Sequence, residues 1–149
     1  MKALIQRVSR AAVRVDGNSV GSIGRGYMIL LGVVAGDTEE DAQALARKTA
    51  KLRLFPSDAK PIDRNLLDAE GRALVVSQFT LCGDVRKGNR PSFVSAAEPV
   101  EAERLYERYC DLLRAEGVEV ETGRFGAMME VELVNDGPVT LMLDTEGRI

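Results

Sequence analysis

The stretch ALVVSQFTL, residues 73–81, is the clearest strand signal in this chain of 149 residues. Its β-branched and aromatic residues favour a strand buried in a sheet. The second half nevertheless carries three polar residues, Ser77, Gln78 and Thr80. Because side chains alternate along a strand, Ser77 and Phe79 are expected on one face. Gln78 and Thr80 are then expected on the opposite face.

Two interpretations of this polar end stay open on pattern alone. Either the strand leaves the core toward solvent, or it ends at a site where backbone N–H groups run out of ladder partners and face a carbonyl oxygen. In the second case Gln78 adds a side-chain donor, and Thr80 adds a hydroxyl that donates and accepts. A covalent role for Ser77 or Thr80 needs a base, and Lys87 is the nearest lysine that follows. Cys82 has no adjacent base, which favours a structural role.

The chain contains no histidine. This excludes Ser-His-Asp and Cys-His catalysis and histidine-based acid–base chemistry, and it removes most kinds of zinc site. Any hydrolysis by this protein must therefore obtain its proton transfer from another group.

The composition, with 45% hydrophobic residues and a net charge of −3, is that of an ordinary soluble globular protein. No stretch approaches the roughly 20 apolar residues of a membrane helix, and the charged start does not resemble a signal peptide. Two distant cysteines favour a reduced cytosolic protein. The acidic balance argues against a surface coated with nucleic-acid-binding charge, but one local basic cluster, RKGNR at residues 86–90, is a candidate. A solvated loop is the alternative reading of that cluster.

The segments around residues 73–81 predict an α/β domain. Helical spacing predicts one helix from Asp37 or Thr38 to about Leu52, and Pro99 and Gly117 mark the ends of a second. Strands are predicted over residues 3–15, 19–24, 27–35, 118–123, 128–134 and 139–144. The run at 27–35 is continuously apolar, which suits a strand buried on both faces. We expect a single domain over residues 1–149, with a curled sheet of six to eight strands and two main helices.

Two glycine-containing segments near the end of the chain carry further candidates. In NDGPVT, residues 135–140, Asn-Asp-Gly would already supply a hairpin turn, whereas Pro138 adds a fixed φ and a missing N–H. The segment is therefore either a turn or a device that presents its backbone. GRFGAMM, residues 123–129, is either a turn packed by Phe125 or one wall of a binding site.

Taken together, short motifs along nearly the whole chain resemble those of the D-aminoacyl-tRNA deacylases, which proofread tRNA charging. They are QRV (6–8), GDT (36–38), LRLF (52–55), VSQFTL (76–81), KGNRPSF (87–93), TGRFGAMM (122–129) and NDGPVT (135–140). The combination of SQFTL with NDGPVT is the most specific part of the match.

The resemblance implies a mixed, β-barrel-like sheet and a homodimer with active sites at the subunit interface, without metal or cofactor. It implies a hydrolase of carboxylic esters that cleaves a D-amino acid, or mischarged glycine, from the 3′ end of tRNA. The catalytic pocket, which receives the terminal adenosine and the ester carbonyl, maps onto Ser77, Gln78, Phe79 and Thr80. Gly137 and Pro138, joined by a cis bond in the family, would enter the other subunit's active site and reject L-amino acids.

The missing histidine fits a mechanism in which the RNA assists its own hydrolysis. We expect water to attack with help from the 2′-hydroxyl of the terminal adenosine. Backbone N–H groups near Phe79, helped by Gln78, would stabilise the oxyanion. Thr80 would hold substrate or water, and an acyl-enzyme on Thr80 is the lesser alternative.

The tRNA partner implies a cytoplasmic protein with a few phosphate contacts, for which Arg86, Lys87 and Arg90 are the candidates. Arg7 is expected to brace the Gly-Pro segment by bonding to its backbone. Two rival functions stay open on the residues alone: a non-catalytic homodimer that binds RNA ends or amino acids, and a Ser or Thr esterase that acts on small esters.

Overall fold

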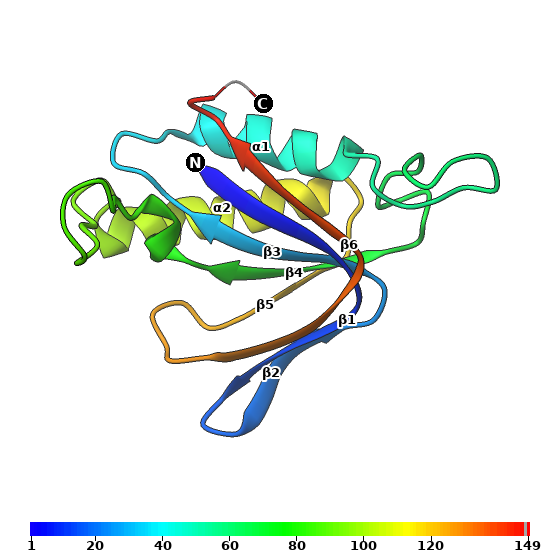
Figure 1. Ribbon diagram of the computed structural model, residues 1–149, viewed down its shortest axis with the longest axis horizontal. Coiled ribbons are helices and arrows are strands. Elements are labelled where there is room, and N and C mark those ends of the chain that lie inside the picture. The colour runs from blue at the N-terminus through cyan, green and yellow to red at the C-terminus, as the bar shows by residue number, and fades with distance from the viewer. Residues whose placement is uncertain (148) are drawn as a thin grey trace.

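The fold is a mixed sheet of six strands with two α-helices, seen in a computed structural model that describes residues 1–147 and 149 (Figure 1). In chain order the elements are β1 (Lys2–Val15), β2 (Asn18–Ile23), β3 (Gly26–Gly32), α1 (Glu39–Lys51), β4 (Arg72–Ser77), the 3₁₀ helix η1 (Phe79–Cys82), α2 (Pro99–Ala115), β5 (Val120–Thr122) and β6 (Glu130–Asp144).

β1 organises the sheet because it pairs with three strands. Its first half is antiparallel to β3, its second half is antiparallel to β2, and β6 runs antiparallel along both halves. β3, β4 and β5 are parallel to one another. Parallel neighbours need crossover connections, which α1 supplies between β3 and β4 and α2 supplies between β4 and β5.

The sheet curls until its two ends approach each other, as the sequence predicted. A Cβ atom on Gly21 of β2 would lie 2.5 Å from the carbonyl oxygen of Thr122 in β5. Only glycine permits this close approach of two backbones. The curl gives the sheet an inside, which holds a small apolar cluster around Val8, Met28 and Leu74.

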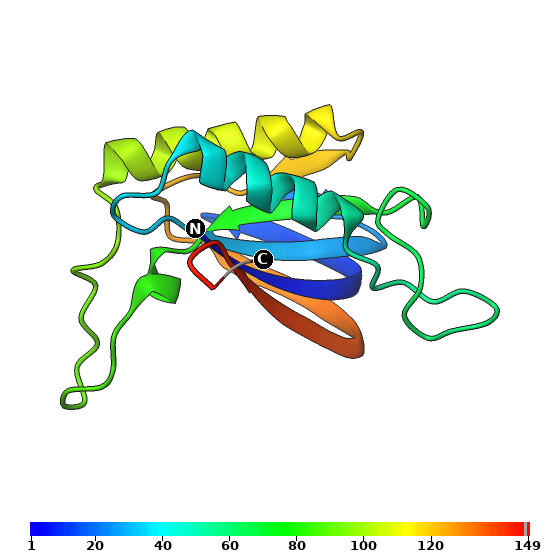
Figure 2. The ribbon, with the colours of Figure 1, turned by 90° about the horizontal axis from the view of Figure 1, so that it is seen from above.

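Both helices cover the same face of the sheet, and Figure 2 shows them side by side above it. The larger core lies between the two layers and includes Ile29, Leu45 and Leu105, none of which is exposed. Each such side chain contributes roughly 1.5–3 kcal/mol by leaving water. β3 is buried along nearly its whole length, which confirms the prediction from its continuous apolar run.

The helix ends follow the local signals in the sequence. Thr38 is the N-cap of α1 and forms a capping box with Asp41, an arrangement that contributes about 1 kcal/mol. Pro99 occupies the first turn of α2, and Gly117 lies beyond its end with φ of +95°. Neither helix is long and apolar enough to cross a membrane, nor is any other helix in the described part of the chain.

Four predicted strands differ from the structure. The strand over residues 73–81 ends at Ser77, because the Gln78 N–H makes the last bond to β3, at Leu31 O, and the chain then turns into η1. The predicted alternation of side chains beyond Ser77 is therefore wrong. Residues 128–134 and 139–144 do not form a hairpin around NDGP, since both pair with β1 as parts of one continuous strand, β6. Residues 118–123 contribute only the short β5.

The close packing of Gly26 in β3 generates a stability prediction. A Cβ at position 26 would lie 1.8 Å from Arg72 O, so Gly26→Ala must push β3 and β4 apart. We expect a loss of about 3 kcal/mol or more in the free energy of unfolding, measured by urea denaturation. Gly24→Ala is the matched control, because nothing lies within 4 Å of a Cβ there and φ is not positive. It should stay within about 1 kcal/mol of the wild type; equal effects of the two substitutions would contradict this packing.

Candidate active site

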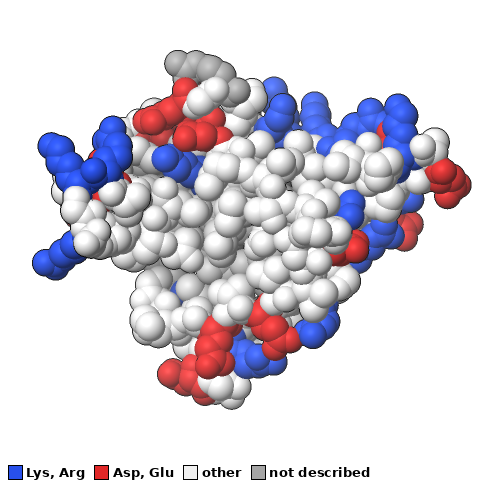
Figure 3. Space-filling view, viewed as in Figure 1, with Lys and Arg blue, Asp and Glu red and all other residues white. Residues whose placement is uncertain are grey.

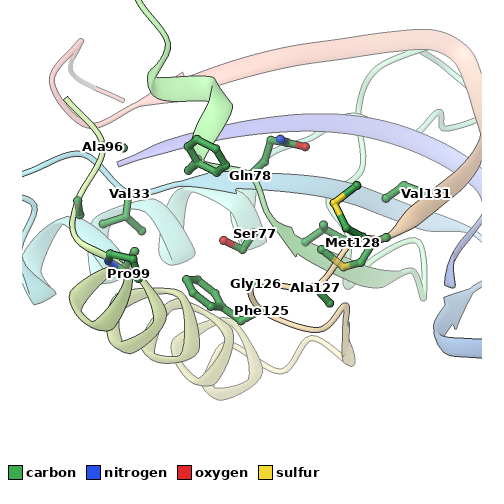
Figure 4. Close-up of a pocket in the computed structure, with 15 residues that line it drawn as sticks. Val33, Ser77, Gln78, Ala96, Pro99, Phe125, Gly126, Ala127, Met128 and Val131 are labelled. Carbon is green, nitrogen blue, oxygen red and sulfur yellow. The ribbon is translucent and has the colours of Figure 1, made fainter. Parts of the chain in front are cut away.

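A cavity of about 530 Å³ lies where β4 ends, beside the start of α2 (Figure 4). Three segments that are distant in sequence form most of its wall. The lining residues are Val33, Val76, Ser77, Gln78, Phe79, Ala96, Ala97, Pro99, Ala102, Phe125, Gly126, Ala127, Met128, Met129 and Val131. Its volume lies in the range of cavities that bind small molecules.

The first wall is the end of β4 with the start of η1. Ser77 is half-buried, and the ring of Phe79 is 55% exposed and packs edge-on against Phe93, with centroids 5.1 Å apart. The Gln78 side chain donates from Nε2 to Thr80 Oγ1 at 2.5 Å. Of the four predicted catalytic residues, three line the cavity, whereas Thr80 lies outside the lining and accepts a hydrogen bond from the lining residue Gln78.

The backbone at this wall offers unused donors. The Gln78 N–H is bound to Leu31 O, and the N–H groups of Leu81 and Gly83 are bound within the turn. Among the described residues, the N–H groups of Phe79 and Thr80 have no acceptor in the protein. Phe79 lines the cavity, so its unbound N–H is a candidate donor to an oxygen of a ligand there.

The second wall is the segment between β5 and β6. Gly126 has φ of +72°, and the Ala127 N–H binds Arg124 O at 3.2 Å, so this segment turns tightly. Phe125 packs against Tyr106 of α2, with ring centroids 5.9 Å apart, and Figure 4 shows its ring on the side of the cavity opposite Gln78. The GRFGAMM segment thus forms a turn packed by Phe125, as one interpretation predicted, and it also lines the cavity with apolar groups.

No lining residue carries an ionisable side chain. The thiol of Cys82 is buried nearby, where it donates to Val33 O, and burial raises its pKa. In the described part of the chain, no three His, Cys, Asp or Glu side chains gather in a way that could hold a metal ion. Polar contacts inside the cavity must come from amide and hydroxyl groups.

The loop after η1 carries the three predicted tRNA-binding residues, none of which lines the cavity. Arg86 donates to both carboxylate oxygens of Asp84, at 2.9 and 2.6 Å, and these bonds lower the pKa of Asp84 to about 2. Its charge is thus largely paired at neutral pH. Lys87 and Arg90 are exposed and form no ion pair with the described residues, and Lys87 makes no bond to Ser77 or Thr80.

The NDGPVT segment forms an irregular stretch of β6 rather than a turn. The Gly137–Pro138 peptide bond is cis, and Gly137 has φ of +152°. The Asn135 side chain spans the irregularity, since it accepts from the Val139 N–H at 2.9 Å and donates to Thr140 Oγ1 at 2.8 Å. Gly137 and Pro138 are exposed and do not line the cavity of their own chain.

Arg7 binds the backbone of this stretch of β6, which confirms its predicted role as a brace. Its guanidinium is almost fully buried and donates from Nε to Asp136 O at 2.7 Å. It also donates from Nη1 to Leu54 O at 2.5 Å. One side chain of β1 therefore ties the Gly137–Pro138 stretch to the segment that follows α1.

Comparison with known proteins gives this geometry a context. Residues 4–144 match the family described as D-Tyr-tRNA(Tyr) deacylase. The D-aminoacyl-tRNA deacylase of Geobacter sulfurreducens is 57% identical over 148 residues, which cover 99% of this chain and 97% of that protein. The D-aminoacyl-tRNA deacylase of Ruegeria pomeroyi is 58% identical and covers 97% of this chain, with 99% of its own length matched. The chain belongs to the D-Tyr-tRNA(Tyr) deacylase family.

Solved structures support the same fold. The c-Myc DNA Unwinding Element Binding Protein superposes with a TM-score of 0.90 at 39% identity, covering 97% of this chain and 98% of its own. A probable eukaryotic D-amino acid tRNA deacylase superposes with a TM-score of 0.82 at 22% identity, covering 95% and 97%. At that identity the second likeness concerns the fold alone. The curled mixed sheet is thus the fold of the deacylase family.

For this member of the family, the sequence predicts two walls of the cavity, one through Ser77, Gln78 and Phe79 and one through residues 125–129. It does not predict the rest of the wall, which includes Val33, Ala96 and Ala97, because small apolar residues in loops carry no pattern that separates a cavity wall from ordinary packing.

The buried thiols of this deacylase family member generate a chemical prediction. Cys82 and Cys110 are both buried, and burial raises the pKa of Cys110 to about 12. Because thiolates are the reactive form, Ellman's reagent at pH 8 should modify neither cysteine in the folded protein and both after denaturation. Rapid labelling of Cys82 in the folded protein, absent in Cys82→Ala, would contradict its structural role.

Proposed function

We propose that residues 1–149 form a single D-aminoacyl-tRNA deacylase domain, an esterase that removes D-amino acids, or mischarged glycine, from the 3′ end of tRNA in the cytoplasm. The observation that carries the proposal is the cavity at the end of β4, lined by Ser77, Gln78 and Phe79 of the family motif. Its polar wall offers neutral donors and its other wall is apolar, so it suits an uncharged ester beside a flat base.

In this proposal the terminal adenosine occupies the cavity. Phe125 and Met129 offer apolar surface for the base, and aromatic faces stack on nucleobases with a gain of roughly 1–3 kcal/mol. The ester carbonyl points at the other wall, toward the free N–H of Phe79. Ser77 and the Gln78 amide then supply further hydrogen bonds to the ester or the ribose.

The chemistry proposed is attack by water, assisted by the ribose 2′-hydroxyl. The cavity wall contains no side chain that titrates, so the protein has no general base there. The neighbouring 2′-hydroxyl is held next to the ester by the substrate itself. The Phe79 N–H stabilises the negative charge on the carbonyl oxygen, an interaction that typically lowers the barrier by about 3–4 kcal/mol.

Thr80 has a supporting role in this mechanism. Its Oγ1 accepts a hydrogen bond from Gln78 and thereby orients the amide at the cavity wall. Lys87, which could serve as the base for a nucleophilic threonine, makes no hydrogen bond to Thr80 among the described residues. This favours the supporting role of Thr80 over a covalent intermediate.

Rejection of L-amino acids is assigned to Gly137 and Pro138 of a second copy of the chain. These residues lie outside the cavity of their own chain, so they reach a substrate only across a dimer interface. β6 exposes apolar side chains that such an interface would bury, among them Leu141 and Met142. The rigid backbone at Gly137 and Pro138 would accept bonds from the substrate ammonium and leave no room for an L side chain.

The proposed chirality filter predicts the behaviour of matched substrates on one tRNA. D-aminoacyl and glycyl esters should be hydrolysed at least about 100-fold faster than the L ester, a difference of about 2.7 kcal/mol. The D ester on a tRNA that ends in 2′-deoxyadenosine should react at least about 100-fold more slowly. The measurement is single-turnover deacylation; equal loss of D and L esters would contradict the filter.

The supporting role of Thr80 predicts a mild loss in Thr80→Ala. We expect kcat to fall by less than about tenfold, because Gln78 loses a partner while the reacting groups remain. Intact-protein mass spectrometry during turnover should detect no acyl adduct. A loss of 10³-fold or more in Thr80→Ala, with activity and an adduct retained in Thr80→Ser, would instead establish a nucleophilic threonine, within the range of roughly 10³–10⁶ for such groups.

A further inference from the structure

A second cavity, of about 660 Å³, lies on the outer side of α1 and is bordered by cations. Arg47 and Lys48 lie four and three positions before Lys51, so they share its face of the helix, and Arg53 follows the helix. These four residues are called the α1 basic surface here. Figure 3 shows Lys and Arg gathered over α1 and the segment after it, toward the upper right of the view.

Two of these charges have no partner among residues 1–147 and 149. Arg47 lies 3.9 Å from Glu116, and Arg53 is paired with Asp63. Lys48 and Lys51 make no ion pair or hydrogen bond with any described residue. In a chain with a net charge of −3, unpaired cations grouped on one face are available for an anionic partner.

The α1 basic surface is structurally tied to the Gly137–Pro138 stretch. Arg53 directly precedes Leu54, whose carbonyl binds the Arg7 guanidinium, and the same guanidinium binds Asp136 O. Figures 1 and 2 both place the C-terminal end of α1 and the bend of β6 toward the same end of the molecule. The cavity at the end of β4 includes no residue of either feature.

We propose that the α1 basic surface binds phosphates of the tRNA whose 3′ end occupies the cavity of the partner subunit. The inference rests on the proposed function, in which Gly137 and Pro138 act in the other subunit. Since Arg7 holds the basic surface close to these residues, the subunit that supplies the chirality filter also supplies phosphate contacts. The loop with Lys87 and Arg90 follows η1, whose first residue, Phe79, lines the cavity of its own chain, so in this proposal cations of both subunits hold the RNA.

Lysines near the C-terminal end of a helix also interact favourably with the helix dipole, and each stabilises the helix by about 0.3–1 kcal/mol. That effect alone would account for Lys48 and Lys51 without any ligand. It acts on stability and is the same for every substrate, whereas phosphate binding depends on the length of the RNA and on salt.

The first experiment compares two substrates, D-aminoacyl-tRNA and 3′-O-(D-aminoacyl)adenosine, with the variant Lys48→Gln/Lys51→Gln. On the tRNA, kcat/KM at 0.1 M salt should fall by roughly tenfold, and the slope of log kcat/KM against log salt should weaken by about 1.4. On the adenosine ester, which lacks the phosphates, the variant should equal the wild type. The control Arg104→Gln/Arg108→Gln removes the same charge from α2, and both of its activities should be unchanged.

The outcomes separate the two proposals. If the wild type hydrolyses neither substrate, the proposed function fails. If it hydrolyses both and the lysine variant matches it on tRNA, or loses activity equally on the adenosine ester, the basic surface has no part in RNA binding. A lower melting temperature without any change in the salt slope would assign the lysines to the helix dipole.

The assignment to the partner subunit is tested with mixed dimers, in which one cavity is inactivated by Phe79→Pro, because proline lacks the backbone N–H that stabilises the oxyanion. When the lysine substitutions are in the subunit with the inactivated cavity, activity on tRNA should fall roughly tenfold below that of the singly inactivated dimer. When they are in the subunit with the intact cavity, activity should not change. The reverse pattern would place the phosphate contacts in the same subunit as the cavity.

Discussion

The hydrogen bond from the Gln78 N–H to Leu31 O is the constraint on which the site depends. It is the last bond of the β3–β4 ladder, and the chain beyond it has no partner strand to follow. The backbone therefore turns into η1, which leaves the Phe79 N–H unbound at a cavity wall. The end of the β4 strand thus leaves a backbone donor beside the cavity.

The Arg7 guanidinium positions the Gly137–Pro138 stretch, just as the end of the β3–β4 ladder positions the backbone at the cavity. Its buried bonds to Leu54 O and Asp136 O fix an exposed stretch of β6 against the segment after α1. The cavity and the Gly137–Pro138 stretch are built by separate interactions and do not meet within one chain. This separation is why a second copy enters the proposed function, and why the cations near Arg7 are assigned to the partner's substrate.

The cavity wall has no ionisable side chain, and this limits the chemistry as much as the hydrogen-bond donors at the wall favour it. A site with no titrating group can position and polarise an ester but cannot move its protons. In the proposed mechanism the protein therefore orients the ester and stabilises the developing charge, while the RNA supplies the 2′-hydroxyl that assists the attack of water. The missing histidine in the sequence and the composition of the cavity wall lead independently to this view.

Local patterns in the sequence determined the limits of both helices, through Thr38, Pro99 and Gly117, and the buried strand β3, because capping and hydrophobic runs act between near neighbours. The motifs alone also pointed to the family and to Ser77, Gln78 and Phe79. Only the tertiary structure decided that the strand stops at Ser77 and that NDGPVT lies within one long strand, since both depend on which strand lies alongside. The same holds for the contact of residues 125–129 with the end of β4 and for the exclusion of Thr80 from the cavity wall. Pairing and cavity walls are contacts between distant segments, and no local pattern encodes them.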